Sequence, residues 1–359
     1  MRESKKTAIY CNTWDADGGG GIVYVLAIAK ILTTNGFDTT VFFNDSILLS
    51  ELHARYETSG LKIKTQKRSH IPLLSQVHFA IKEWFNFDIV IQQSLVGPRL
   101  TFVKESYILC DFPMGKRETI SEKIRFRFWK NTIVNSDYTK QWVQNYWKRD
   151  ALVLYPLIDI PTEFNCNRNI DIVCIGRFNN GRRSKRQDVV ISVFKDLIQL
   201  GYEGVRLHLV GYVQDENYVN NLKDSVFGFP VLFHENCLAK DRITLLNNSA
   251  VFISACGFEN NEKLEPMLVE HFGISVIEAM SYGAIPLVIG KGGHLETVDN
   301  RINGYHWSTK EELKEILILL FENRQLRETM SKEAYSKSME YSSKKLEEKV
   351  LKVFVKPKI

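Results

Sequence analysis

Residues 270–288 carry the sequence EHFGISVIEAMSYGAIPLV. Gly273 precedes an apolar run over 274–280, and this pattern predicts a loop that leads into a short buried helix. Gly283 ends that helix, and residues 285–289 are apolar and partly β-branched, which is typical of a strand. A helix followed directly by a strand indicates one repeat of an alternating α/β sheet.

The same alternation extends along the rest of the chain. In the second half, the sequence predicts a helix over 189–200 and strands over 170–175, 205–210, 231–233 and 251–253. In the first half, it predicts a strand over 8–11, a glycine loop at 18–21, a buried helix over 22–32, and strands over 39–43, 88–91, 106–110 and 132–135. The expected fold class is therefore α/β, with two doubly wound, Rossmann-like domains.

A proline-containing segment separates the two halves. Residues 155–161 hold two of the nine prolines, and the polar residues 165–169 follow them. Because proline and polar runs mark exposed connections, we expect a first domain over 1–158 and a second over 159–339.

Composition excludes several classes of protein. The chain has 359 residues, 44% of them hydrophobic and 25% charged, which excludes disorder, collagen and coiled coil as the whole structure. No apolar run reaches 18 residues, so no membrane-spanning helix is expected, and the polar start predicts no signal peptide. Six scattered cysteines without a CxxC pattern predict thiols in a reducing cytosol.

The net charge of +5 lies entirely in the first half. Residues 1–160 hold 21 Lys and Arg against 16 Asp and Glu, whereas residues 161–359 hold 26 of each. A basic half favours an acidic partner such as anionic lipid, nucleic acid or a phosphorylated acceptor. A mildly basic surface without a partner is the alternative.

Two glutamates in the opening stretch indicate chemistry. Glu270 precedes the predicted helix and Glu278 lies within it. The amides at a helix N-terminus bind anions, and carboxylates accept hydrogen bonds from sugar hydroxyls, so the pair suits a phosphorylated sugar. The alternative is an acidic helix cap, with Glu278 on a solvated face.

Further motifs resemble those of family 4 retaining glycosyltransferases. They are residues 290–298 (GKGGHLETV), 175–178 (IGRF), 185–188 (KRQD), 205–211 (VRLHLVG), the glycines at 18–21, and 132–140 (TIVNSDYTK) with Trp142 and Tyr155-Pro156. The chain resembles the branch that contains the lipid-linked-oligosaccharide α-1,2-mannosyltransferase of the endoplasmic reticulum and bacterial polysaccharide glycosyltransferases. The resemblance is specific over 170–300 and looser before 130.

This resemblance implies a GT-B fold whose two Rossmann-like domains face a cleft. The first domain would bind the acceptor, with a C-terminal helix at about 340–359 packing back onto it, and the second would bind the donor. The implied reaction moves a hexose from GDP-mannose or a UDP-hexose to a glycan or lipid-linked acceptor, with retention, in polysaccharide or glycoconjugate biosynthesis. It needs no metal and no cofactor.

The resemblance also implies the site residues. Arg177 and Lys185 would hold the diphosphate, Glu270 would contact the donor sugar, and Glu278 would accept from the ribose hydroxyls. Glycine and backbone amides would approach the donor at Gly19, Gly20, Gly176, Phe272, Gly273 and Ile274. The catalytic residues would be Arg177, Lys185, Glu270 and Asp111.

Asp111 departs from the family pattern. It follows Cys110 and precedes Phe112-Pro113, where many relatives carry a histidine near the reacting face of the sugar. It would orient the acceptor hydroxyl or the donor sugar, or else cap the strand end. A second acidic pattern, Asp15-Ala16-Asp17, matches a metal motif of other glycosyltransferases, but the GT-B interpretation predicts no metal because Arg177 and Lys185 replace it.

Two segments interleave basic and aromatic residues, and both predict surface contacts. Residues 123–130 (KIRFRFWK) predict either peripheral contact with an anionic membrane or a buried helix with basic ends, rather than nucleic-acid binding. Residues 61–86 are a second candidate for acceptor or membrane contact. We therefore expect a cytoplasmic protein that contacts the cytoplasmic membrane face and binds no nucleic acid.

Two competing functions remain open at this point. A nicotinamide oxidoreductase would need a Gly-x-Gly-x-x-Gly motif, and the glycines at 18–21 lack the third position. A catalytically inactive GT-B scaffold or nucleotide-sugar-binding protein would be supported only by the departure at Asp111.

Overall fold

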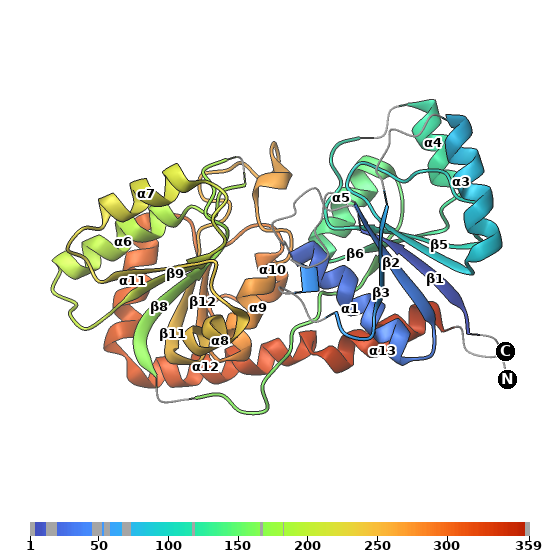
Figure 1. The fold of residues 1–359 in the computed structure, drawn as a ribbon. Coiled ribbons are helices and arrows are strands. Elements are labelled where there is room, and N and C mark those ends of the chain that lie inside the picture. The colour runs from blue at the N-terminus through green and yellow to red at the C-terminus, as the bar shows by residue number, and fades with distance from the viewer. Residues whose placement is uncertain are drawn as a thin grey trace. The chain divides into compact units, whose positions relative to one another are not determined.

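The computed structural model describes residues 4–11, 20–44, 52–53, 58–66, 73–116, 119–165, 168–181 and 183–355. The chain divides into two compact units, residues 1–157 with 344–359 and residues 158–343. Each unit is a parallel sheet with helices on both faces (Figure 1). The expected α/β class with two doubly wound domains is confirmed.

The first unit contains a seven-stranded sheet in the order β3-β2-β1-β4-β5-β6-β7. Its strands are β1 (Lys6–Tyr10), β2 (Asp38–Asn44), β3 (Lys62–Gln66), β4 (Ile89–Gln93), β5 (Glu105–Cys110), β6 (Asn131–Val134) and β7 (Leu152–Val153). Its helices are α1 (Gly20–Thr34), α3 (Leu73–Asn86), α4 (Ile120–Arg127), α5 (Asp137–Trp147) and α13 (Ser343–Phe354).

Alternating strand residues divide the core of this unit between two faces. On one face, β1 and β4 pack with α1, and Leu346, Val350 and Phe354 of α13 complete that layer. On the other face, residues of α3, α4 and α5 cover the sheet, with Phe126 and Trp147 in contact. The last helix of the chain therefore belongs to the core of the first unit.

The second unit contains a six-stranded parallel sheet in the order β10-β9-β8-β11-β12-β13. Its strands are β8 (Asn169–Ile175), β9 (Leu207–Gly211), β10 (Val231–Glu235), β11 (Ser249–Ser254), β12 (Ile285–Ile289) and β13 (Tyr305–Trp307). Its helices are α6 (Gln187–Gln199), α7 (Glu216–Ser225), α8 (Ala239–Asn248), α9 (Ile274–Ser281), α10 (His294–Thr297), α11 (Lys310–Glu322) and α12 (Arg324–Ser338), with short 3₁₀ turns at Pro266–Leu268 and Met339–Tyr341.

Both sheets reverse their strand order once, between β1 and β4 in the first unit and between β8 and β11 in the second. In open α/β sheets, ligands bind at the carboxyl ends of the strands beside such a reversal. The fold thus directs attention to the residues that follow β8 and β11, and to those that follow β1, β4 and β5.

The structure adds short strands to those expected from the sequence. Residues 62–66 form the edge strand β3, and the helix α3 follows from Leu73. β7 and β13 are also not predicted from the sequence, because two or three residues carry no clear period. Within the described residues, no helix is both long enough and apolar enough to span a bilayer.

Candidate functional site

The carboxyl end of β8 supplies the floor of the candidate site. β8 ends at Ile175, and the chain continues through Gly176 and Arg177. A Cβ atom at Gly176 would collide with Cγ of Lys185, so only glycine lets the stem of that lysine cross the strand end. The structure therefore gives Gly176 a defined role, which is to make room for Lys185.

Lys185 pairs with Glu270 across 85 residues of sequence. Its Nζ lies 2.5 Å from Oε2 of Glu270, and the two side chains are 23% and 19% exposed. The same Nζ lies 3.9 Å from Sγ of Cys256, which follows β11. The reversal between β8 and β11 thus brings together two of the predicted catalytic residues.

This ion pair is charged at neutral pH. Burial alone would raise the pKa of Glu270, but the charge of Lys185, then those of neighbouring groups led by His294, lower that pKa to about 2. Burial alone would lower the pKa of Lys185, but Cys256 and Glu270 hold it above its ordinary value, against the positive charge of Arg177. The positive charge of Arg177 thus acts on Lys185.

Two histidines beside Glu270 stay neutral. Burial lowers the pKa of His271 to about 3 and that of His294 to about 4, although the negative charge of Glu270 opposes both shifts. His294 is fully buried, and its Nδ1 donates to the carbonyl oxygen of Ile289 at 2.9 Å. Neutral imidazoles leave Lys185 as the cation that is paired with Glu270, and the charge of the exposed Arg183 acts on His271.

The glycine pair at 292–293 fixes the backbone of the Glu270 segment. A Cβ atom at Gly292 would collide with the carbonyl oxygen of Glu270, and one at Gly293 would collide with that of His271. The N–H of Gly293 donates to the carbonyl oxygen of Glu270 at 2.7 Å. Gly273 then enters α9 at φ +97°, a conformation that favours glycine. Backbone packing therefore places Glu270 and the first amides of α9.

Glu278 lies in the second turn of α9 and is not on a solvated face. Its side chain is 19% exposed, and Nε and Nη2 of Arg242 donate to its Oε1 at 3.1 and 2.8 Å. Burial raises the pKa of Glu278, while Arg242 opposes that rise. Arg242 on α8 was not predicted as a site residue, because nothing in the sequence links it to a residue 36 positions away.

Gln187, the first residue of α6, is a second contributor that sequence reasoning missed. It is buried, and its Nε2 donates to the carbonyl oxygens of Gly176 and Arg177, both at 3.1 Å. Its Oε1 accepts from the hydroxyl of Tyr218 at 3.2 Å. Gln187 thereby anchors the segment that carries Arg177. Gln187 lies within the KRQD motif, which gives it no role of its own.

Asp111 and the glycine loop belong to the first unit. Asp111 follows β5, and its Oδ2 accepts from Nε2 of Gln93 at 2.6 Å. Gly20 is the first residue of α1. Gly19 lies outside the described residues, as do Asp15 and Asp17, so these predictions stay untested.

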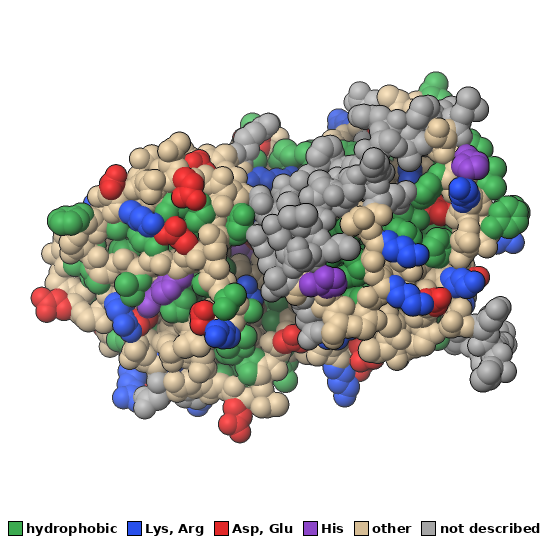
Figure 2. Space-filling model, in the orientation of Figure 1, with side chains coloured by type: hydrophobic (Ala, Val, Ile, Leu, Met, Phe, Trp, Pro, Cys, Tyr) green, Lys and Arg blue, Asp and Glu red, His purple; other side chains and the backbone are tan. Residues whose placement is uncertain are grey.

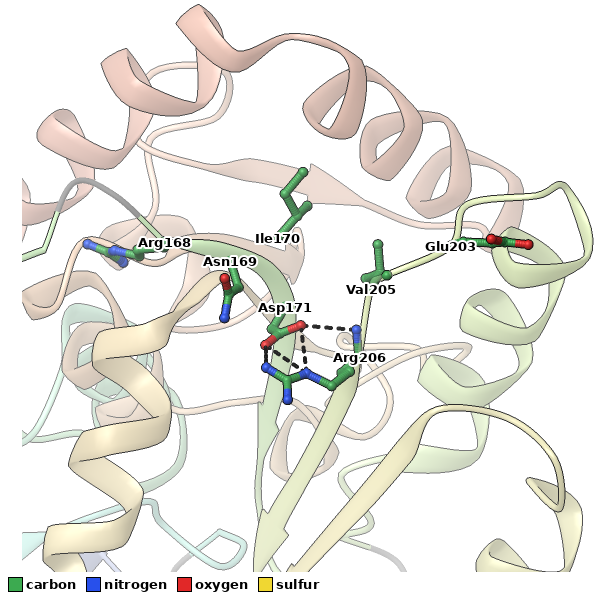
Figure 3. Close-up of a pocket in the computed structure, with 8 residues that line it drawn as sticks. Arg168, Asn169, Ile170, Asp171, Glu203, Val205 and Arg206 are labelled. Atoms are coloured by element: carbon green, nitrogen blue, oxygen red, sulfur yellow. Dashed lines mark hydrogen bonds and ion pairs between the residues drawn. The ribbon is translucent and has the colours of Figure 1, made fainter.

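One pocket of the second unit lies away from these residues. It has a volume of about 450 Å³ and is lined by residues 168–171 and 203–206. These segments stand at the amino ends of β8 and β9, and Arg206 and Asp171 pair with each other there, Nη2 to Oδ2, at 2.6 Å (Figure 3). The pocket is therefore at the sheet edge opposite Lys185 and Glu270. Among the described residues, no group of three or more His, Cys, Asp or Glu side chains could hold a metal ion.

Comparison with curated proteins shows similarity to mannosyltransferases. One is a GDP-Man:Man(3)GlcNAc(2)-PP-Dol alpha-1,2-mannosyltransferase of Candida glabrata, 28% identical over 185 residues, with 45% of this chain and 33% of the relative covered. Another is the alpha-1,3/1,6-mannosyltransferase ALG2 of the same organism, 24% identical over 243 residues, with 54% and 51% covered. The chain spans about a third to a half of the length of these relatives.

Solved structures share the whole fold. A glycosyltransferase from Rickettsia africae superposes with a TM-score of 0.76 at 17% identity, over 99% of this chain and all of the other. Anabaena HepE in complex with UDP and glucose superposes with a TM-score of 0.71 at 15% identity, over 98% of this chain and all of the other. At such identities the likeness shows the fold alone.

The model of one protein family covers most of the second unit. The family described as glycosyl transferases group 1 matches residues 163–337, which include Arg177, Lys185, Glu270 and Glu278. The resemblance stated from the sequence motifs is confirmed. Residues 163–337 therefore match the glycosyl transferases group 1 family, in a chain with the GT-B fold.

Proposed function

We propose that this protein is a retaining hexosyltransferase that uses a nucleotide sugar, GDP-mannose or a UDP-hexose, and a glycan or lipid-linked acceptor. The observation that carries the proposal is the buried Lys185–Glu270 pair beside Arg177, at the carboxyl edge of a parallel sheet. The name of the alpha-1,2-mannosyltransferase relative contains GDP-Man and a PP-Dol acceptor, ALG2 is named as a mannosyltransferase, and HepE is in complex with UDP and glucose. These names support the substrate class.

The donor diphosphate would compete with Glu270 for Lys185. Arg177 offers a planar fork of donors and Lys185 a point charge, and together they stabilise the negative charge that grows on the leaving diphosphate. When Lys185 turns to the phosphate, the carboxylate of Glu270 becomes available to a hydroxyl of the donor sugar. The amides of Phe272, Gly273 and Ile274 then face the sugar phosphate, and no metal is required.

Glu278 would accept hydrogen bonds from the two ribose hydroxyls. Arg242 occupies Oε1, and it holds the carboxylate in one orientation. A carboxylate accepts about four hydrogen bonds, so Glu278 can bind a diol while it stays paired with Arg242.

Transfer would take place on one face of the sugar. The oxygen of the acceptor hydroxyl bonds to the anomeric carbon while the bond from that carbon to the phosphate oxygen breaks. The hydroxyl proton passes to an oxygen of the departing diphosphate, so no side chain forms a covalent intermediate. An inactive scaffold is not favoured, because Arg177, Lys185, Glu270 and Glu278 are all present.

Nucleotide binding is tested first, and sugar transfer is tested second. The melting temperature of the protein is measured with UDP, GDP, ADP, NADH and a panel of sugar nucleotides. A ligand at about 100 times its dissociation constant adds about 2.7 kcal/mol to the unfolding free energy, which raises the midpoint by several degrees. One nucleotide series should stabilise the protein and then support transfer, and Arg177→Ala or Lys185→Ala should abolish turnover. Absence of any shift with sugar nucleotides, or wild-type turnover by both variants, contradicts the proposal.

We further propose that α3 and α4 contact the surface of an anionic membrane. α3 and α4 cover the same face of the first sheet, and they expose Trp84 (52%), Phe85 (76%) and Ile120 (76%). Exposed basic residues accompany them at Lys82, Lys123, Arg127 and Lys130, and Figure 2 shows hydrophobic and basic side chains together over this part of the unit. Aromatic and cationic groups suit the lipid interface. We expect the protein to float with vesicles rich in phosphatidylglycerol but not with phosphatidylcholine, and Trp84→Ala with Phe85→Ala to abolish flotation. Equal flotation of this variant contradicts the contact.

A further inference from the structure

We infer that Gln93 is a positioning residue that holds the carboxylate of Asp111 ionised and in one orientation toward a substrate hydroxyl. The inference rests on the proposed function and assigns a residue to it that no sequence motif singles out. Gln93 is the last residue of β4, and its side chain is only 2% exposed. A glutamine buried at the end of a strand must satisfy both ends of its amide.

The contacts of Gln93 form a chain across three strand ends. Its Nε2 donates to Oδ2 of Asp111 at 2.6 Å, and its Oε1 accepts from Sγ of Cys11 at 3.1 Å. Cys11 follows β1, and Asp111 follows β5, while β1, β4 and β5 are neighbours in the sheet. The chain therefore runs along the carboxyl edge of the sheet at its strand reversal, where ligands bind in such folds.

The chemistry of the partners fixes which way the amide points. An ionised carboxylate only accepts hydrogen bonds, so Gln93 must present its NH₂ group to Asp111. The amide oxygen then faces Cys11, whose S–H is a weak donor. Asp111 thus receives a donor that stabilises its charged form, whereas a flipped amide would place two acceptors against each other.

The backbone of Asp111 is held separately. The hydroxyl of Thr139, in the first turn of α5, donates to the carbonyl oxygen of Asp111 at 3.1 Å, and Ser136 donates to that hydroxyl at 2.9 Å. Main chain and carboxylate are thus fixed by different elements. A residue that merely ended a strand would need only the hydrogen bond from Thr139 to its main chain. The hydrogen bond from Gln93 defines the direction of the carboxylate itself.

The titratable side chains of Tyr24 and Cys11 lie near the carboxylate of Asp111 or its partner Gln93. Tyr24 of α1 is fully buried, burial and then the charge of Asp111 raise its pKa, and its hydroxyl donates to the carbonyl oxygen of Leu154 at 2.5 Å. Cys11 faces it through Gln93. Neither is cationic, and the hydrogen bond that Gln93 donates favours the ionised form of Asp111.

Activity measurements with matched variants test this role. Gln93→Leu removes the donor and should lower kcat about 10- to 100-fold with a small change in KM for the donor, because the loss is one of positioning. Gln92→Leu is the control: Gln92 is the preceding residue, is buried too, and bonds to the backbone N–H of Arg99 rather than to Asp111. In an Asp111→Asn background, Gln93→Leu should add no further loss. Equal losses for both glutamine variants, or an undiminished loss in that background, overturn the inference.

A pH profile separates positioning from folding. Gln93→Glu places two carboxyl groups side by side, so they share a proton at low pH and repel once both ionise. Its activity relative to wild type should therefore fall as the pH rises through the second ionisation of the pair. A loss that is constant over pH indicates damage to the fold instead.

A substrate-free measurement keeps the inference independent of the proposed reaction. Carboxyl carbons of aspartate are labelled with ¹³C, and Asp111 is titrated by NMR in wild type, Gln93→Leu and Gln92→Leu. The pKa of Asp111 should rise by about one unit in Gln93→Leu alone, since the donor to its charged form is lost. Equal titrations in all three proteins overturn the inference. Absence of transfer by wild type, with the titrations as expected, contradicts the proposed function alone.

Discussion

At the scale of single residues, the candidate site is built from pairs that satisfy buried charges. Glu278 illustrates this: burial raises its pKa, and the positive charge of Arg242 opposes that rise. Two of the three predicted carboxylates have a partner that the motifs do not contain: Arg242 for Glu278 and Gln93 for Asp111. Only Glu270 has a predicted partner, Lys185. Charged groups out of water need such partners, so the motifs name only half of two of these pairs.

Arg242→Ala should therefore weaken donor binding more than catalysis. We expect KM for the nucleotide sugar to rise about 10-fold with kcat nearly unchanged, because Glu278 loses its orientation but touches no reacting atom. Loss of Arg242 also raises the pKa of Glu278 further, so protonation should make the defect grow as the pH falls. Lys240→Ala, an exposed change on the same helix, is the control for steady-state kinetics. A drop in kcat with constant KM would argue against this assignment.

At the scale of elements, the hydrophobic periodicity and apolar content of a segment decide whether its secondary structure can be predicted from the sequence. Residues 285–289 are predicted as a strand and form β12 with the same bounds. β3 escapes prediction because the sequence KIKTQ is mostly polar and lies at the sheet edge. Contacts such as that between Lys185 and Glu270 join the ends of different strands, so they follow from strand order, which the sequence does not determine.

The loop 290–293 offers a test of how elements support the site. Gly293→Ala should cost about 1–3 kcal/mol, because the added methyl group meets the backbone of His271 and Phe272, which cannot move aside without displacing α9. The nucleotide-induced rise in melting temperature should be lost together with this stability. Gly204→Ala is the matched control, since Gly204 has open space around it and lies at the opposite edge of the sheet. It strains the backbone at φ +79° but should leave the nucleotide response intact. An unaltered response in Gly293→Ala contradicts the role given to this loop.

At the scale of the whole molecule, the buried histidines of the second unit link its stability to pH. Burial lowers the pKa of His271 to about 3 and that of His294 to about 4, whereas an unfolded chain titrates histidine near 6.5. Between these values the unfolded state binds more protons than the native state. Stability is therefore complete above pH 6.5 and falls as the pH drops toward 4, with Glu270 extending the loss down to about pH 2.

The urea midpoint of the second unit, followed by hydrogen exchange of its sheet amides, should thus decrease between pH 7 and pH 5. Each histidine contributes a slope of at most about 1.4 kcal/mol per pH unit. His294→Asn removes one of the two groups and can keep a hydrogen bond to Ile289, so its midpoint should depend less on pH than that of wild type. The sheet of the first unit provides the internal reference, because neither histidine lies in it. A midpoint that is constant over this range would show that both imidazoles are protonated in the native fold, and Lys185 would then share its carboxylate with other cations. An equal dependence in His294→Asn would show that His294 does not contribute.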